Sequence, residues 1–426
     1  MKLFSHTSPA IRNLYFYNIF VSLTLTIAAN YTFLDRLFLR LQIDLGNFGF
    51  IKSIMFLLPA VSYQLCTPLL QKLNKDIEIC AFSYALRAAL PLLLPFLAIF
   101  CTDKTVLTWA CALLPAGGML FAVFANNSLM KIYRQVIPLD KYNYTTGMMN
   151  TFLSFPVFLL ALPMAWLLDR FNGLADREFY LLFALLQLFT FIFEIPALVF
   201  LFRVKLRSAG TAAASASAKS SLLQPYRSPD LRLMLLLNFL LRAGSGLSLA
   251  YLTVFFLKVV NWSMTLLIVV ELILTAASDL FRPFSGRMLD RWGCAGLFPF
   301  FAGGLLLGVA GLCIFWGSVW ILPFFILLTW NGLNSFCAVT LSQGIYAATG
   351  KLADKSWIGS AVAASSLTGN GGFFAGFLCS SWLYSLAAGL GGSVLGTTLR
   401  WYYILTLPCF LAIFALALVI RRRKIM

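Results

Sequence analysis

Long apolar stretches alternate with short polar segments along almost the whole chain. Each apolar stretch runs for about 20 residues or more, which is the length a helix needs to cross the hydrocarbon core of a bilayer. Charged residues, prolines and glycines mark the breaks between the stretches. The pattern predicts twelve membrane-spanning helices, at residues 13–38, 48–71, 77–100, 105–130, 144–168, 179–202, 231–257, 262–284, 294–316, 319–346, 356–385 and 399–420.

A polar segment divides the predicted helices into two sets of six. This segment, residues 204–229, is rich in Ala and Ser and carries several basic residues, a composition typical of flexible linkers. We therefore expect an N-terminal six-helix bundle at 1–203 and a C-terminal six-helix bundle at 230–426. The halves also resemble each other weakly, because an Ile-Tyr pair followed by an Asp-Lys pair occurs in both 132–141 and 345–355. Such repetition is typical of transporters built from two related halves.

The composition supports the same class. Of 426 residues, 61% are hydrophobic and 11% are charged, whereas an ordinary soluble domain carries about 25% charged residues. The sequence therefore predicts an all-α membrane protein with twelve transmembrane helices in two pseudo-symmetric bundles.

The net charge of +17 is better explained by the membrane than by nucleic acid, because the basic residues are scattered in small groups between the apolar stretches. Most Lys and Arg residues fall on one side of the membrane when the N-terminus is placed inside, as the positive-inside rule requires. We expect cytoplasmic termini and a cytoplasmic linker, a monomer in a bacterial inner membrane, and no nucleic-acid partner.

Residue types that carry catalysis are scarce. His6 is the single histidine, and the nine cysteines form no CxxC pair, so neither a metal site nor a disulfide framework is indicated. The sequence also lacks HxxxD, DxD and DDxxD clusters and the GxxxxGK[ST] loop of ATP-driven transporters. We expect no enzyme activity, no metal and no cofactor.

One charged stretch, RPFSGRMLDRWG at 282–293, follows the eighth predicted helix. It resembles the loop signature of the major facilitator superfamily, Gly-x-x-x-Asp-Arg-x-Gly. The matching residues are Gly286, Asp290, Arg291 and Gly293, and the preceding Arg282 is also frequent in that superfamily. The resemblance implies a cytoplasmic gate that latches the halves in one state and releases as they rock.

The residue types in the stretch suit that role. Gly286 lets a neighbouring helix approach closely, Asp290 can accept hydrogen bonds at a helix N-terminus, and Gly293 permits a tight turn. The corresponding stretch of the first half, TPLLQKLN at 67–74, departs from the signature. We therefore expect the second half to carry most of the gate.

Ionisable residues inside a membrane are functional candidates by default. Five lie well inside predicted helices, namely Arg87, Glu194, Arg242, Glu271 and Asp279. In the superfamily's arrangement the first, fourth, seventh and tenth helices line the cavity. This placement makes Arg87 and Glu194 peripheral, as a packing pair or beside a kink near Pro196.

Arg242 and Glu271 are better placed, on the seventh and eighth predicted helices. Glu271, with Arg242 as partner, is expected to bind a coupling proton or to help bind a polar substrate, and a static ion pair is an equal alternative. Asp279 is expected to pair locally with Arg282. Three further charges, Asp35, Arg36 and Lys52, fall near the outer face, where we expect their side chains to snorkel to water.

Amide side chains add candidates on the cavity helices. They suit a neutral or zwitterionic polar solute, although such groups also join helices to one another. The cavity-lining candidates are Asn30, Asn126, Asn238, Asn331 and Asn334.

These observations favour a secondary transporter that moves a small solute by alternating access, with proton coupling open. A lipid or lysolipid flippase on the same fold is the alternative, and a membrane-embedded transferase is a weaker one. The fifth predicted helix lacks the Gly-Pro-x-x-Gly-Gly motif typical of drug antiporters, which argues against multidrug antiport.

Overall fold

The computed structural model describes residues 8–28, 30–73, 75–137, 159–204, 224–274, 292–314, 358–392 and 394–423, together with short runs at 156–157, 288–289 and between 337 and 352. Throughout these residues the regular secondary structure is helical, as the sequence predicts. By its internal contacts the chain divides into two units. Unit 1 comprises Met1–Ile43 and Val61–Ser217, and unit 2 comprises Asp44–Ala60 and Ala218–Met426.

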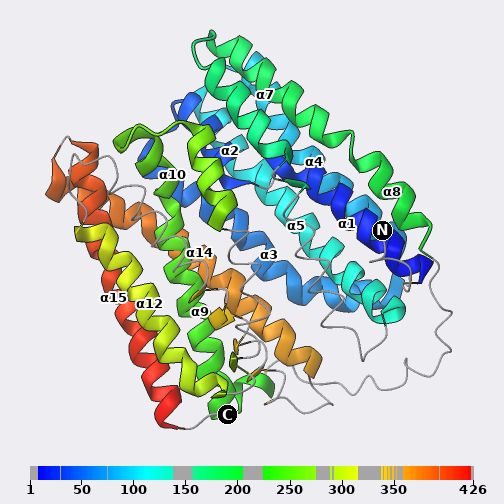
Figure 1. Cartoon of the computed structure of the whole chain (residues 1–426), viewed down its shortest axis with the longest axis vertical. Helices are drawn as coiled ribbons and strands as arrows, with labels where there is room; N and C mark the ends of the chain where they lie inside the picture. The colour runs from blue at the N-terminus through cyan, green and yellow to red at the C-terminus, as the bar shows by residue number, and fades with distance from the viewer. Residues whose placement is uncertain are drawn as a thin grey trace. The chain divides into compact units, whose positions relative to one another are not determined.

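Unit 1 is built from two sets of neighbouring helices (Figure 1). Helix α4 packs against both α5 and α7, and α1 packs against α8. A tyrosine-rich cluster fills the space between α1, α4 and α5, with Tyr17, Tyr84 and Tyr133 buried in it. The helices are α1 (Pro9–Ala28), α2 (Tyr31–Arg40), α4 (Asp76–Phe100), α5 (Lys104–Val136), α7 (Asp176–Phe191) and α8 (Glu194–Phe202).

Two predicted helices of unit 1 are each divided in two. The first predicted span consists of α1 and α2, and Asn30 caps α2 by accepting a hydrogen bond from the Thr32 amide at 2.8 Å. The sixth consists of α7 and α8, which meet just before Pro196. Proline lacks an amide hydrogen and its ring clashes with the carbonyl four residues earlier, which explains the break beside Ile192.

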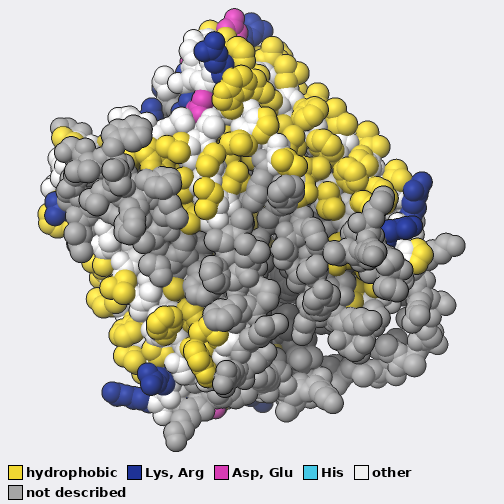
Figure 2. Space-filling view, in the orientation of Figure 1, with side chains coloured by type: hydrophobic (Ala, Val, Ile, Leu, Met, Phe, Trp, Pro, Cys, Tyr) yellow, Lys and Arg dark blue, Asp and Glu magenta, His cyan; other side chains and the backbone are white. Residues whose placement is uncertain are grey.

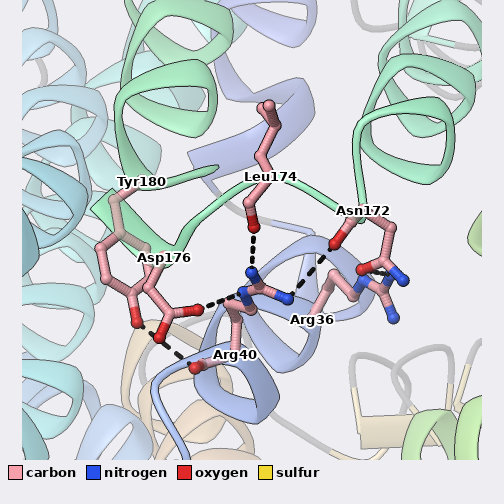
Figure 3. A network of polar contacts seen from close by, with 6 residues as sticks. All are labelled: Arg36, Arg40, Asn172, Leu174, Asp176 and Tyr180. Atoms are coloured by element: carbon pink, nitrogen blue, oxygen red, sulfur yellow. Dashed lines mark hydrogen bonds and ion pairs between the residues drawn. The ribbon is translucent and has the colours of Figure 1, made fainter. Parts of the chain in front are cut away.

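Polar contacts join the end of α2 to the start of α7 (Figure 3). The Arg40 guanidinium pairs with Asp176 at 2.8 Å and donates to the backbone carbonyls of Asn172 and Leu174. Arg36 donates to the side-chain oxygen of Asn172 at 2.6 Å, and the Tyr180 hydroxyl donates to the Arg40 carbonyl. This network holds the connection after residue 170 in place.

Unit 2 contains the first part of α3 (Leu45–Leu73) and the helices of the second half of the chain. Helix α9 packs along α14 and also contacts α15, which in turn packs against α12 and α14 (Figure 1). Residues 264–274 are also helical. The remaining elements are η4 (Gln224–Tyr226), α9 (Pro229–Ala250), α10 (Leu252–Val254), the π-helix η5 (Phe255–Val259), α12 (Cys294–Ile314), α14 (Ile358–Gly391) and α15 (Leu395–Arg422).

Glycines of α14 allow its close approach to α9. A Cβ atom added to Gly372 would lie 2.4 Å from the Phe239 carbonyl oxygen, and one added to Gly376 would lie 2.2 Å from the Ala243 carbonyl oxygen. Backbone atoms cannot move aside as a flexible side chain can. Small residues are therefore required at this crossing, as in many pairs of membrane helices.

Seven segments of the described residues are long and apolar enough to cross a membrane. Hydrophobic side chains are widely exposed on the helices. Figure 2 shows them over broad areas of the visible face, with Lys and Arg in a few small groups. The protein is therefore a multi-pass membrane protein. The number of twelve spans stays a prediction, because residues 138–155 and 315–336 lie outside the described part.

The expected snorkelling of Asp35 and Lys52 is wrong. Their side chains are 0% and 1% exposed, respectively. The Lys52 ammonium instead donates to the Ala250 carbonyl at 2.9 Å, because α9 ends at that residue and its last carbonyls have no partner within the helix. Arg36 is bound by the network of Figure 3.

Candidate functional site

Most of the loop signature lies outside the described residues, including Arg282, Gly286, Asp290 and Arg291. Gly293 is described, with a φ of 75°, and its amide donates to the Leu289 carbonyl at 3.0 Å. A positive φ strongly favours glycine, and α12 begins at the next residue. The tight turn expected at Gly293 is therefore present, and the gating role of the signature stays a prediction.

Arg242 lies on α9 with its side chain partly buried. One terminal nitrogen of its guanidinium donates to the Ser342 hydroxyl at 2.9 Å, and its central carbon lies 5.3 Å from the centre of the Phe373 ring on α14. A cation at mid-membrane costs at least about 2.5 kcal/mol on insertion scales. A cation over an aromatic face recovers about 0.5–2 kcal/mol, so these two contacts offset part of that cost.

Asn238 lies one helical turn before Arg242 and is fully buried. Its amide nitrogen faces three acceptors on α14: the Ser365 carbonyl at 2.8 Å, the Thr368 hydroxyl at 3.2 Å and the Ser365 hydroxyl at 3.4 Å. The structure thus brings together Asn238 and Arg242, because residues four apart share one face of a helix. Asn238 fixes α9 against α14 beside the arginine.

The stem of Arg242 is held closely by the same helix. A Cβ atom added to Gly372 would lie 2.9 Å from the Arg242 Cβ, and one added to Gly369 would lie 3.4 Å from the Asn238 amide nitrogen. The Phe373 ring stacks on Phe56 at 4.8 Å and lies 6.1 Å from Phe377, which itself stacks on Phe56 at 5.5 Å, so the three rings form one mutual cluster. These contacts hold the Arg242 side chain in a defined position within unit 2.

Glu271 and Asp279 are the acidic candidates on the eighth predicted helix. Glu271 is half-buried on the helical residues 264–274, and its pairing with Arg242 stays a prediction. Asp279 lies outside the described residues, so its pairing with Arg282 and its part in coupling stay predictions too.

The other amide candidates have separate positions. Asn30 caps α2, and the exposed Asn126 of α5 accepts a hydrogen bond from the Tyr84 hydroxyl at 2.8 Å. Arg87 lies over the Tyr84 ring at 5.7 Å. Asn331 and Asn334 lie outside the described residues.

Glu194 begins α8 and is buried. Helix α8 packs against α1, and α1 also holds Asn18, whose side-chain oxygen accepts from the Tyr133 hydroxyl at 2.8 Å. These contacts join helices within unit 1. The peripheral, packing role of the Glu194 side chain stays a prediction.

Nothing in the sequence indicated Ser342 and Phe373 as neighbours of Arg242, or Ser365 and Thr368 as partners of Asn238. Serine, threonine and phenylalanine are common in apolar helices, so their types give no signal. The pattern of glycines at 369, 372 and 376 could have indicated that this stretch of α14 packs against another helix.

No family model and no curated protein matches the sequence. Solved structures do match the fold. The nucleoside transporter NupG aligns with a TM-score of 0.67 at 12% identity, over 95% of this chain and 98% of that chain. A bacterial homologue of the human lysosomal transporter Spinster aligns with a TM-score of 0.68 at 11% identity, over 97% and 96%.

A bacterial homologue of the iron transporter ferroportin gives a TM-score of 0.68 at 14% identity, over 97% of this chain and 98% of that chain. At such identities the likeness establishes the fold. Nearly complete coverage of both chains means that the likeness extends through both halves of the sequence. The protein therefore has the fold of these solved transporter structures.

Proposed function

We propose that the protein is a secondary transporter that moves a small solute across the membrane by alternating access. The similar structures support this proposal, since they include a transporter of nucleosides and a D-xylose-proton symporter. The observation that carries it is the set of polar contacts made from α9, where Arg242 donates to Ser342 and Asn238 donates to Ser365 and Thr368. Helices α9 and α14 are otherwise largely apolar.

Burying these polar side chains costs free energy, and helix packing alone would not require it. Apolar residues of similar size would join α9 and α14 without desolvating a cation or an amide. Polar groups at membrane depth mark substrate or ion pathways. We therefore assign solute binding to the face of α9 that carries Asn238 and Arg242.

The proposal also includes a cytoplasmic gate and an orientation of the chain in the membrane. We place the 282–293 loop at a cytoplasmic gate and both termini in the cytoplasm of a bacterial cell, with the distribution of Lys and Arg in support. The protein acts as a monomer, with bundles at 1–203 and 230–426. Glu271 is the candidate for proton coupling.

A thermal-shift screen of the purified full-length protein against a library of small solutes, at two pH values, tests the site. A solute that stabilises the wild type is expected to lose its effect in Arg242→Met. Its effect should persist in Arg232→Met, a matched control at an exposed position near the start of α9. If no solute stabilises the wild type, and none exchanges in proteoliposomes, the transport proposal fails.

Proton coupling has its own test. Glu271→Gln keeps the shape of the side chain and removes its charge. In proteoliposomes with an imposed pH gradient, we expect this variant to exchange solute without being driven by the gradient. Unchanged gradient-driven uptake would remove Glu271 from the coupling mechanism.

A further inference from the structure

Arg242 presents a positive charge that its described neighbours do not neutralise. Ser342 offers it a neutral hydroxyl, and Phe373 offers an aromatic face. Among the described residues, the structure pairs it with no carboxylate. A cation held at membrane depth in this way is stabilised incompletely, because a hydroxyl and a ring replace only part of the water that it would have in solution.

The guanidinium keeps donors for a further ligand. It carries five N–H groups, and the bond to Ser342 uses one of them. A guanidinium matches the geometry of a carboxylate or phosphate through two parallel hydrogen bonds. In the described part of the chain, the structure gives the guanidinium one hydrogen-bond acceptor, Ser342, and one cation–π neighbour, Phe373.

The packing around the Arg242 guanidinium favours binding of a specific ligand. The Arg242 stem lies against Gly372, Asn238 ties α9 to α14 one turn earlier, and Phe373 belongs to a cluster of stacked rings with Phe56 and Phe377. A side chain fixed on two packed helices loses little freedom when it binds a ligand. The arrangement therefore favours a defined anionic group over a diffuse attraction.

Within the proposed transport function, on which this inference rests, we propose that Arg242 binds an oxyanion of the transported solute, a carboxylate or a phosphate. This choice narrows the neutral or zwitterionic solute expected from the amide residues, because it requires an anionic group, which a zwitterion carries and a neutral solute lacks. Asn238 acts as a positioning residue, since its fully buried side chain holds α9 without reaching the solute.

Pairs of solutes that differ only in the oxyanion test the proposal. Lactate is compared with lactamide, and glycerol 3-phosphate with glycerol, by thermal shift of the full-length protein. We expect at least one charged member to raise the Tm at millimolar concentration while its neutral partner does not. The two pairs also distinguish a carboxylate site from a phosphate site.

Substitutions of Arg242 test whether the charge-dependent binding occurs at this residue. Arg242→Met keeps an unbranched stem against Gly372 and is expected to weaken binding of the charged member by about tenfold or more. Arg242→Lys should bind with intermediate affinity, because it keeps the charge and loses the two-pronged geometry. Arg232→Met should bind like the wild type. Equal binding by Arg242→Met, or an Arg242→Lys variant no better than Arg242→Met, would overturn the proposal.

Transport measurements distinguish failure of the proposed anion site from failure of the proposed transport function. Neutral solutes that exchange in proteoliposomes, with the same rate in Arg242→Met, would leave a transporter without an anion site. The absence of a charge-dependent shift in the wild type for both pairs would also overturn the inference. Failure of every solute to exchange would instead remove the proposed function itself.

Discussion

The Lys52 ammonium donates a hydrogen bond of 2.9 Å to the Ala250 carbonyl, although the side chain is only 1% exposed. Helix α9 ends at Ala250, and the chain continues through Tyr251 into α10 and the π-helix η5. The carbonyls at the end of α9 therefore need partners from elsewhere. Lys52 of α3 supplies one, and the Tyr402 hydroxyl of α15 supplies another to Leu247.

We predict that Lys52→Ala lowers stability more than Lys52→Met. Alanine removes both the hydrogen bond and a large buried side chain, for a loss of about 2 kcal/mol or more. Methionine keeps most of the side-chain volume, so the main loss is the hydrogen bond to the Ala250 carbonyl. Thermal denaturation of the purified variants gives the order. A Met variant as stable as the wild type would mean that Lys52 acts through its volume alone.

Two adjacent glycines of α14, Gly371 and Gly372, provide a matched pair of alanine substitutions that tests the packing of α14 against α9. Gly372→Ala is expected to destabilise the protein by about 1–3 kcal/mol, because the new methyl group would meet the Phe239 carbonyl at 2.4 Å. Gly371 has no atom within 4 Å of the same position. Gly371→Ala should therefore be neutral or stabilising by up to about 1 kcal/mol, as expected for Gly to Ala in a helix. Thermal denaturation of both variants would refute the packing argument if their Tm values fell equally.

Asn238→Ala removes the amide that contacts Ser365 and Thr368. Hydrogen bonds between membrane helices contribute about 0.6 kcal/mol on average and up to about 1.7 kcal/mol, so we expect a loss in this range. Asn47→Ala, at an exposed position near the start of α3, is the control. Chemical unfolding in mixed detergent micelles measures both, and an equal response would count against the role of Asn238.

The contacts in Figure 3 predict unequal effects for the two partners of one ion pair. Asp176→Asn should cost about 0.2–1 kcal/mol, because the pair is exposed. Arg40→Ala should cost more, since Arg40 also donates to the Asn172 and Leu174 carbonyls. Arg177→Ala is the control at an exposed neighbour. Melting curves at low and high salt should show a salt-sensitive loss for Asp176→Asn, and a loss for Arg40→Ala that persists at high salt.

Much of the fold could be predicted from the sequence. The apolar stretches gave the approximate positions of α3, α4, α5, α9, α12, α14 and α15, because each helix must be apolar over its whole length to lie in lipid. Local rules also predicted the break near Pro196 and the turn at Gly293.

The contacts of the charged residues could not be predicted in this way. A membrane helix is apolar on the side that faces lipid and on the side that faces its neighbours, so hydropathy does not distinguish the two. Lys52 and Asp35 were therefore expected at the water interface, and both are buried. The partner groups of Arg242 come from positions about 100 and 130 residues away in the sequence.

The sequence by itself determined that this chain is a helical membrane protein and where most of its long apolar helices lie, because length and hydropathy act locally along the chain. Only the tertiary structure decided that α14 passes close enough to α9 for Phe373 to lie against Arg242, and that Lys52 meets the end of α9. Both contacts depend on how small residues let particular helices approach one another, which a single sequence does not specify.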